Sequence, residues 1–283
     1  MSYQFSLAHL TLIGASAPEL TYIAARAGYD FVSLRLIPMG VAGECACPAQ
    51  DKAMMRATRA ALDATGIELH DVELARIVAD RDPKSYVPAM EVAAELGARH
   101  LISSAWTTDG TDRDFIVERF AEICDLAAPF GLTVDLEFPT FSRLTNLREA
   151  ADIVRTADRP NAGILIDTIY THFSQLDPGE LDSLPREWWH FIHIADAPGE
   201  IPSERDDMIH IARDARLYPG EGCVDFEALL GRLPPVTCSI ELPNLKRVEE
   251  LGYEGHARRC LEAARRCLEP HSFPETPAQR YIA

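Results

Sequence analysis

Four side chains that could bind a divalent cation lie at or near the C-terminal ends of four short apolar segments. They are Glu137 in TVDLEF, Asp167 in GILIDT, His193 in WHFIHIAD and Glu241 in TCSIEL. Each segment is typical of a buried strand, where a lone carboxylate would be unfavourable. A shared cation would remove that penalty. Three carboxylates and one imidazole suit Mn²⁺, Mg²⁺ or Co²⁺ better than structural Zn²⁺, so we expect one such ion.

The elements that would position these residues recur along the chain as an apolar helix face, a glycine and a strand. The glycines are Gly28, Gly66, Gly97 and Gly131, each suited to the position after a helix C-terminus. We predict eight strands, over 5–12, 31–37, 67–74, 100–104, 132–138, 162–167, 189–195 and 237–242. Alternating helices and strands indicate parallel βαβ units. This regularity favours a closed (β/α)₈ TIM barrel over an open doubly wound sheet, and no G-x-G-x-x-G follows the first strand.

The length of the chain agrees with one such barrel. It has 283 residues, and a barrel of this kind needs roughly 250. We therefore predict a single domain over 1–269 and a proline-rich C-terminal tail over 270–283. The tail would pack on the surface or on a second subunit of a homo-oligomer, or form a frayed end.

The composition limits the kinds of partner that we expect for this chain. The formal charge of −17 would repel phosphate backbones, and no basic stripe offsets it, so we expect no nucleic acid partner. No apolar run approaches the roughly 18 residues of a membrane span, and the N-terminus lacks the basic region of a signal peptide. We expect a cytoplasmic protein with no membrane partner. The seven cysteines form no C-x-x-C pair and are expected to be reduced thiols.

Five segments over 5–268 resemble the xylose-isomerase-like TIM barrels, the sugar phosphate isomerase/epimerase superfamily. They are LEFP around Glu137, LIDT around Asp167, HIADAP around His193, SIELP around Glu241, and the stretch from Arg216 to Phe226. The resemblance implies that the first four residues bind one divalent metal ion. It also implies that Glu137 and Glu241 form the acid/base pair and that Arg216 contacts substrate oxygens. Many relatives carry a histidine three residues after the sixth-strand aspartate, where this chain has Tyr170, and a histidine follows at His172.

This superfamily includes ketose 3-epimerases, hydroxypyruvate isomerase, inosose dehydratase and 3-dehydroshikimate dehydratase. In their shared chemistry a metal ion stabilises the enediolate formed when a carboxylate removes an α-proton. We predict an isomerase or epimerase of a small keto-sugar or related polyol. The alternative is a dehydratase or lyase of a cyclic β-hydroxy ketone, of the 3-dehydroshikimate or inosose type. A third hypothesis is a non-catalytic barrel that binds a sugar.

Other residues at predicted strand ends are candidates for substrate binding. Arg35 would bind a substrate carboxylate or phosphate, or equally form a salt bridge with a carboxylate such as Glu73. Glu73, on the third strand, is itself a candidate for substrate binding. Trp106 would stack on a sugar ring or simply pack. His9 would lie at the same end of the first strand, and His172 would close over the ligand from a loop. Asp196 would orient the site or cap the following loop.

Overall fold

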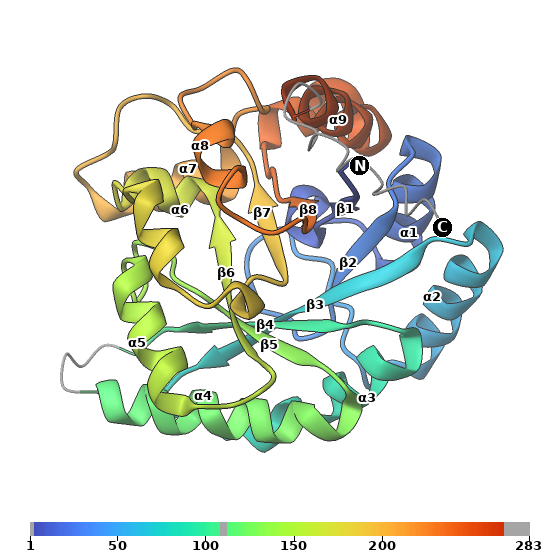
Figure 1. Cartoon of the computed structure of the whole chain (residues 1–283). Helices are drawn as coiled ribbons and strands as arrows, with labels where there is room; N and C mark the ends of the chain where they lie inside the picture. Colours follow the sequence, from blue (N-terminus) through green and yellow to red (C-terminus); the bar gives the residue numbers. More distant parts are fainter. Residues whose placement is uncertain (1–2, 108–111, 269–283) are drawn as a thin grey trace, which may run out of the picture.

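A closed parallel barrel forms the centre of the protein. The computed structural model describes residues 3–107 and 112–268. Its eight strands follow one another in chain order, and β1 pairs with β8 to close the ring. The helices lie outside the strands (Figure 1). This confirms the predicted (β/α)₈ TIM barrel. The predicted tail over 270–283 lies outside the described residues, so the division of the chain at 269 stays a prediction.

Seven strands lie close to their predicted positions, although β3 runs three residues further. The strands are β1 (Phe5–Leu7), β2 (Phe31–Arg35), β3 (Glu68–Ile77), β4 (His100–Ala105), β5 (Thr133–Glu137), β6 (Ala162–Asp167), β7 (Phe191–Ile194) and β8 (Thr237–Ile240). The helices are α1 (Ala17–Ala27), α2 (Lys52–Thr65), α3 (Val87–Leu96), α4 (Arg113–Ala127), α5 (Leu147–Ala157), α6 (Thr168–Phe173), α7 (Arg205–Asp214), α8 (Phe226–Leu230) and α9 (Leu245–Leu268).

The first strand is shorter than predicted. The predicted range was 5–12, but β1 ends at Leu7 and a 3₁₀ turn follows over His9–Leu12. The Thr11 hydroxyl donates a hydrogen bond to the carbonyl of Ile240 (2.8 Å) and accepts one from the N–H of Leu242 (2.9 Å). These contacts hold the turn against the end of β8. An apolar run of this length is compatible with a strand or a buried helical turn, so periodicity alone could not separate them.

The helices follow from the spacing of apolar residues and from their ends. In α5 the buried residues include Leu147, Ala150, Val154 and Ala157, which share one face of a 3.6-residue helix. The four glycines predicted to end helices all have positive φ, between 70° and 94°, which a residue without Cβ adopts at no steric cost. The local sequence therefore favours helices in the same segments where the barrel has them.

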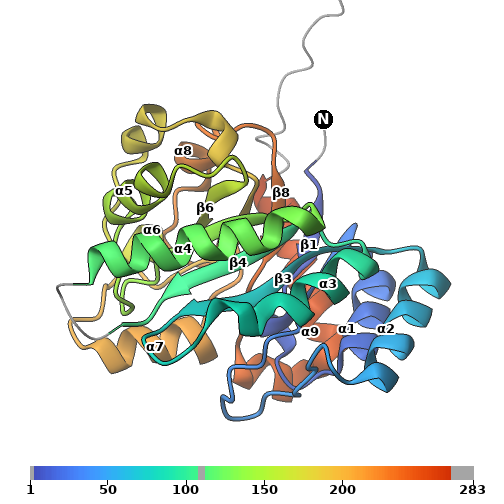
Figure 2. The same ribbon diagram turned by 90° about the horizontal axis from the view of Figure 1, so that it is seen from below.

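The first and last helices of the barrel lie next to each other. Helix α1 packs against both α2 and α9, so the last helix lies beside the first (Figure 1). On another side, α3 and α4 cover β3 from outside (Figure 2). Within residues 3–107 and 112–268, none of the helices is both long and apolar enough to cross a membrane.

The barrel interior is layered. Leu165 and Phe191 stand two residues before Asp167 and His193, and therefore point to the same faces of β6 and β7. With Leu74 and Ile102 they form a small apolar cluster separate from the main core. Since Asp167 and His193 lie towards the C-terminal ends of their strands, this apolar layer separates that end of the barrel from the N-terminal end.

A glycine in β6 makes room for a contact between its neighbours. A Cβ on Gly163 would lie 2.6 Å from Asp135 Oδ1 and 2.6 Å from His190 Nδ1. We expect Gly163→Ala to lower the free energy of unfolding by about 1–3 kcal/mol through overpacking, measured by urea denaturation. Gly199→Ala, where a Cβ meets no atom within 4 Å, is the control. Equal stability of the two variants would contradict the close packing.

Candidate active site

The four predicted metal ligands come together at the C-terminal end of the barrel. Glu137 and Asp167 are the last residues of β5 and β6, His193 is the third residue of β7, and Glu241 directly follows β8. Adjacent parallel strands end at one edge, which brings these side chains together. One ligand atom from each residue lies within 4.8 Å of those from the other three.

Burial and missing hydrogen bonds make this cluster suitable for a cation. All four residues are at most 7% exposed. His193 Nδ1 lies 3.4 Å from Glu241 Oε2 and 3.7 Å from Glu137 Oε1, yet neither ring nitrogen makes a hydrogen bond within the described part of the chain. Buried imidazole nitrogens normally have partners. A divalent metal ion among these oxygens and this nitrogen would supply one, so the residues fit such an ion.

Arg216 balances part of the negative charge. Its guanidinium is fully buried and lies 2.8 Å from both Asp167 Oδ2 and Glu241 Oε2. It also donates hydrogen bonds to the carbonyls of Ala212 (2.7 Å) and Glu241 (2.9 Å). Three ionised carboxylates against one guanidinium would leave two negative charges, which a divalent cation would neutralise. Arg216 therefore holds the carboxylates in place, and its contact with substrate oxygens stays a prediction.

The metal-free cluster shares protons unequally. Burial raises the pKa of Glu137 to about 7, and the nearby charge of Glu241 acts in the same direction. Burial would also raise the pKa of Glu241, but His193 and Arg216 outweigh it and hold that pKa well below its usual value. Burial opposes a charge on His193, yet Glu241 and Glu137 raise its pKa well above the ordinary value. Without metal, Glu137 and His193 thus each tend to keep a proton near neutral pH.

These shifts predict how stability depends on pH. Between about pH 6.5 and 8 the folded metal-free protein holds protons on Glu137 and His193 that the unfolded chain releases. Its free energy of unfolding should therefore fall by about 1 kcal/mol as pH rises through this window. Buried histidines with a lowered pKa, such as His9, are neutral in the folded state but still partly protonated in the unfolded chain near pH 6.5, so they offset part of this fall at the lower end of the window. Denaturation at several pH values with a chelator present measures this dependence. Glu137→Gln should make the fall in stability smaller. A free energy of unfolding that rises with pH in this window would contradict the prediction.

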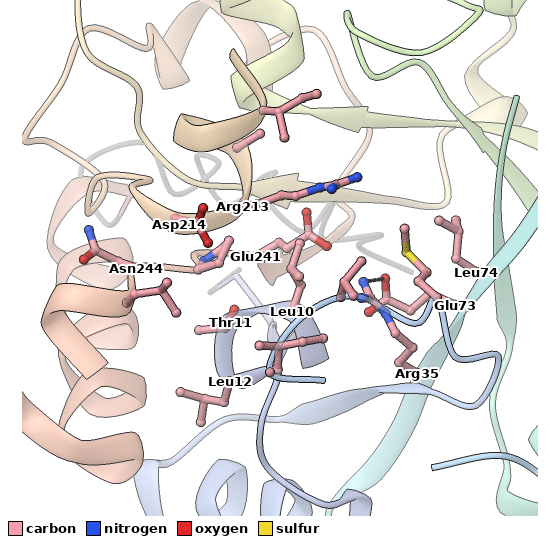
Figure 3. Close-up of a pocket in the computed structure, with 18 of the residues that line it drawn as sticks. Leu10, Thr11, Leu12, Arg35, Glu73, Leu74, Arg213, Asp214, Glu241 and Asn244 are labelled. Atoms are coloured by element: carbon pink, nitrogen blue, oxygen red, sulfur yellow. Dashed lines mark hydrogen bonds and ion pairs between the residues drawn. The ribbon is translucent and has the colours of Figure 1, made fainter. Parts of the chain in front are cut away.

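A pocket of about 680 Å³ opens above the cluster, within the usual range for small-molecule sites. Figure 3 shows Glu241 between Arg35 and Glu73 on one side and Asp214 and Asn244 on the other. Apolar side chains form much of the wall, and sequence reasoning did not predict them, because they come from turns, loops and helices after the strands whose placement depends on tertiary packing. They include Leu10, Met39, Phe141, Tyr170 and Ile209.

Arg35 is paired with acidic residues in the pocket wall. Its guanidinium lies 2.7 Å from Glu73 Oε2 and 3.8 Å from Glu44 Oε1. The salt bridge with Glu73 is the second of the two alternatives predicted from the sequence. Glu44 was not predicted, because it comes from a loop; the N–H groups of Met39 and Gly40 donate to its carboxylate at 3.1 and 2.6 Å. Arg35 and Glu73 both line the pocket, so their contact with substrate stays open as a proposal.

His9 and Trp106 occupy different surroundings. His9 is fully buried, accepts a hydrogen bond from the N–H of Arg35 at Nδ1 (2.9 Å) and lies 2.9 Å from the carbonyl of Ala15 at Nε2. It therefore fixes the backbone beside the pocket. Trp106 lines the pocket, and its indole N–H donates to the Ser104 hydroxyl (2.7 Å). The Trp106 ring lies next to that of Phe141 in a tilted arrangement, with ring centroids 5.9 Å apart.

The polar contacts of the His172 and Asp196 side chains are with residues other than the four ligands. His172 lines a separate cavity, with both ring nitrogens 3.6 Å from Cys223 Sγ. The Asp196 carboxylate accepts hydrogen bonds at 2.9 Å from the N–H groups of Gly220, Gly222 and Val224. It therefore caps its loop, as one of the two predicted alternatives had it. The same long connection contains α7, whose residues Arg213 and Asp214 reach the pocket.

Comparison with known proteins places the chain among related barrels. The xylose isomerase-like TIM barrel family matches residues 22–267. A 3-dehydroshikimate dehydratase from Pseudomonas aeruginosa is 33% identical over 125 residues, covering 44% of this chain and 19% of that protein. An inosose isomerase from Bacillus licheniformis is 26% identical over 155 residues, covering 52% of this chain and 53% of that protein. The matched segments thus span about half or less of these two relatives.

Solved structures share the fold. The IolI protein with a bound zinc atom has a TM-score of 0.75 at 18% identity, covering 96% of this chain and 100% of that protein. A D-allulose 3-epimerase from Methylomonas sp. has a TM-score of 0.69 at 17% identity, covering 94% and 99% respectively.

Proposed function

Since this chain belongs to the xylose isomerase-like TIM barrel family, we propose that it is a divalent-metal-dependent isomerase or epimerase of a small keto-sugar or related polyol. The observation that carries the proposal is the buried convergence of Glu137, Asp167, His193 and Glu241, in which neither nitrogen of His193 makes a hydrogen bond to any residue over 3–107 and 112–268. The proposed ion is Mn²⁺, Mg²⁺ or Co²⁺, and these four residues would hold it. Relatives named as an isomerase and an epimerase support the class of reaction.

The two glutamates have the roles of base and acid. Glu137 and Glu241 come from different sides of His193, each within 4 Å of its Nδ1. One would remove the proton beside a substrate carbonyl, and the other would return a proton to the opposite face or the neighbouring carbon. A bound divalent ion supplies Lewis-acid stabilisation of the negative charge on substrate oxygen. Arg216 would keep Glu241 and Asp167 oriented through its buried ion pairs.

Hydrogen exchange tests this proposal. The manganese-loaded protein is incubated in D₂O with a panel of ketohexoses and a keto-inositol, and NMR follows the carbon beside each carbonyl. We expect deuterium at that carbon of at least one compound, together with its epimer or isomer. Folded, metal-loaded protein that exchanges none of them above the rate of buffer with manganese would contradict the proposed chemistry.

A second candidate function is dehydration of a cyclic β-hydroxy ketone that carries a carboxylate. The specific observation is Arg213, which lines the pocket (Figure 3) and has no ion-pair partner among the residues that the structure describes. Arginine binds carboxylates through two parallel hydrogen bonds. A match at 33% identity to a 3-dehydroshikimate dehydratase also favours this candidate over neutral substrates.

Ultraviolet absorbance separates the two candidates. 3-Dehydroshikimate is added to the metal-loaded protein, and formation of a conjugated product is followed. If dehydration is the activity, Arg213→Gln should raise KM for this acid and leave the pocket otherwise intact. Absence of any absorbance change, alongside exchange with neutral ketoses, would exclude the dehydratase.

A further inference from the structure

A second group of metal-binding side chains lies at the opposite, N-terminal end of the barrel. His100 is the first residue of β4, Asp135 lies in β5, and His190 directly precedes β7. One ligand atom from each lies within 4.8 Å of those from the other two. We refer to His100, Asp135 and His190 as the floor cluster. Asp135 is fully buried, whereas both histidines are partly exposed.

Hydrogen bonds connect both imidazoles to Asp135, directly for His190 and through the Thr133 hydroxyl for His100. His190 Nδ1 lies 2.7 Å from Asp135 Oδ1. The Thr133 hydroxyl donates its proton to Asp135 Oδ2 (2.9 Å), so it can only accept from His100 Nδ1, 2.7 Å away. His100 Nδ1 is itself 3.8 Å from Asp135 Oδ2. Each Nδ1 atom thus lies near one oxygen of the carboxylate, and a cation would displace the His190 proton from Asp135 and the His100 proton from Thr133.

The barrel leaves space for this arrangement. The contact between Asp135 and His190 passes over Gly163, where any Cβ would lie 2.6 Å from both side chains. The φ of Gly163 is not in the left-handed region, so close approach, and not backbone geometry, accounts for the glycine. The rings of His100 and His190 stack with centroids 5.6 Å apart and planes inclined by 22°. Both donors are therefore held in a fixed relative orientation.

Solvent reaches the floor cluster. A separate pocket of about 560 Å³ is lined by His70, His100 and His190. The side chains of His100 and His190 are 13% and 20% exposed. A cation could therefore enter and keep water in its remaining coordination positions. His70 faces the same pocket, but its Nδ1 is engaged by Asp71 Oδ1 at 2.9 Å.

An apolar layer separates the floor cluster from the candidate active site. Phe191 lies with its ring centroid 5.7 Å from that of His193 on one side and 5.2 Å from that of His100 on the other. Ile102 and Leu165 complete the layer with Phe191. The two clusters therefore do not share ligands, and an ion in one is distinct from an ion in the other.

We propose that the floor cluster binds a second divalent cation of the zinc type. Two imidazoles and one carboxylate are donors that Zn²⁺ and Co²⁺ favour, with water as a fourth ligand. With metal–ligand bonds of about 2.0–2.1 Å, tetrahedral ligand atoms lie about 3.3 Å apart, so the present limit of 4.8 Å requires closure by about 1.5 Å at most. The ion would connect β4 and β5 to the start of β7, in place of the proton between His190 and Asp135 and the proton between His100 and Thr133.

Zinc content after dialysis against excess zinc and then buffer tests this proposal. We expect two ions per chain in the wild type and one in His193→Asn, in which only the floor cluster remains complete. The double variant His100→Gln/His190→Gln should also hold one. His70→Gln is the matched control, since His70 faces the same pocket outside the floor cluster, and it should keep two ions. Thermal unfolding of each variant verifies that it is folded.

The result in His193→Asn is independent of the proposed enzymatic function, because that variant lacks an active-site ligand. One zinc ion there, lost on adding His190→Gln, supports the floor site even if no substrate is turned over. A His193→Asn protein that retains no zinc contradicts it. So does a folded His100→Gln/His190→Gln variant with the same zinc content as the wild type. If the double variant does not fold, the single His190→Gln, whose amide can still donate to Asp135, gives the same comparison.

Discussion

Glu241→Gln is expected to lower turnover and deuterium exchange by about 10²- to 10⁴-fold, the usual contribution of a positioned general acid or base. The amide keeps the shape of the side chain but can neither take a proton nor carry the charge beside His193. Glu241 is 4% exposed and lies 3.4 Å from His193 and 2.8 Å from Arg216. The measurement is exchange into the substrate in D₂O at saturating manganese, which limits the effect of weaker metal binding.

Glu254→Gln is the matched control, because Glu254 is an exposed glutamate that pairs with Arg26 on the surface. It should exchange at the wild-type rate. Full exchange in a folded Glu241→Gln variant would remove this residue from the proposed chemistry. Loss of exchange that is restored by manganese above the concentration that saturates the wild type would instead assign Glu241 to metal binding alone.

Arg216→Met is expected to lower the free energy of unfolding by about 3–5 kcal/mol, because it leaves buried carboxylates without their partner. Methionine fills part of the space of the arginine stem, so the loss would be mainly electrostatic. Asp167 and Glu241 are almost fully buried and cannot regain water easily. Urea denaturation of the metal-free protein measures the change. Manganese should then stabilise the variant more than the wild type, since it supplies the missing positive charge.

Arg258→Met, which removes an exposed pair with Glu254, should leave stability nearly unchanged because such pairs contribute little. If Arg216→Met and Arg258→Met were equally stable, the buried guanidinium would not be holding the cluster together. If manganese did not reduce the difference in free energy of unfolding between Arg216→Met and the wild type, the loss of stability would come from packing.

Much of the fold could be predicted because local signals agree with the barrel. The strand in the segment GILIDT ends at Asp167 both in the prediction and in the structure, since apolar residues followed by a carboxylate mark the end of a buried strand. The first strand could not be bounded in this way. His9 and Thr11 are held by bonds to Ala15, Arg35, Ile240 and Leu242, and contacts with distant residues leave no periodic signal in the local sequence.

The site was predictable where it depends on strand ends and not where it depends on loops. The four ligands converge because β5 to β8 are neighbours, which follows from chain order in a barrel. The path of the loop that carries Glu44 and the turn that places His172 beside Cys223 depend on tertiary packing. For Arg35 the sequence offered substrate binding or a salt bridge, and only the structure placed Glu73 beside it.

The floor cluster was also outside the reach of sequence reasoning. Asp135 lies two residues before Glu137 on β5, so both carboxylates point to the same face of the strand, one nearer each end of the barrel. Nothing in the spacing indicates that His190 would cross Gly163 to reach Asp135. That contact depends on the stagger of β5, β6 and β7.

Anomalous diffraction from a crystal soaked in manganese tests the central claim most directly. We expect a peak among Glu137, Asp167, His193 and Glu241, with oxygen or nitrogen atoms of all four close enough to coordinate it, and its loss in His193→Asn. A fully occupied manganese peak elsewhere, with these four side chains turned apart and no density between them, would contradict the account.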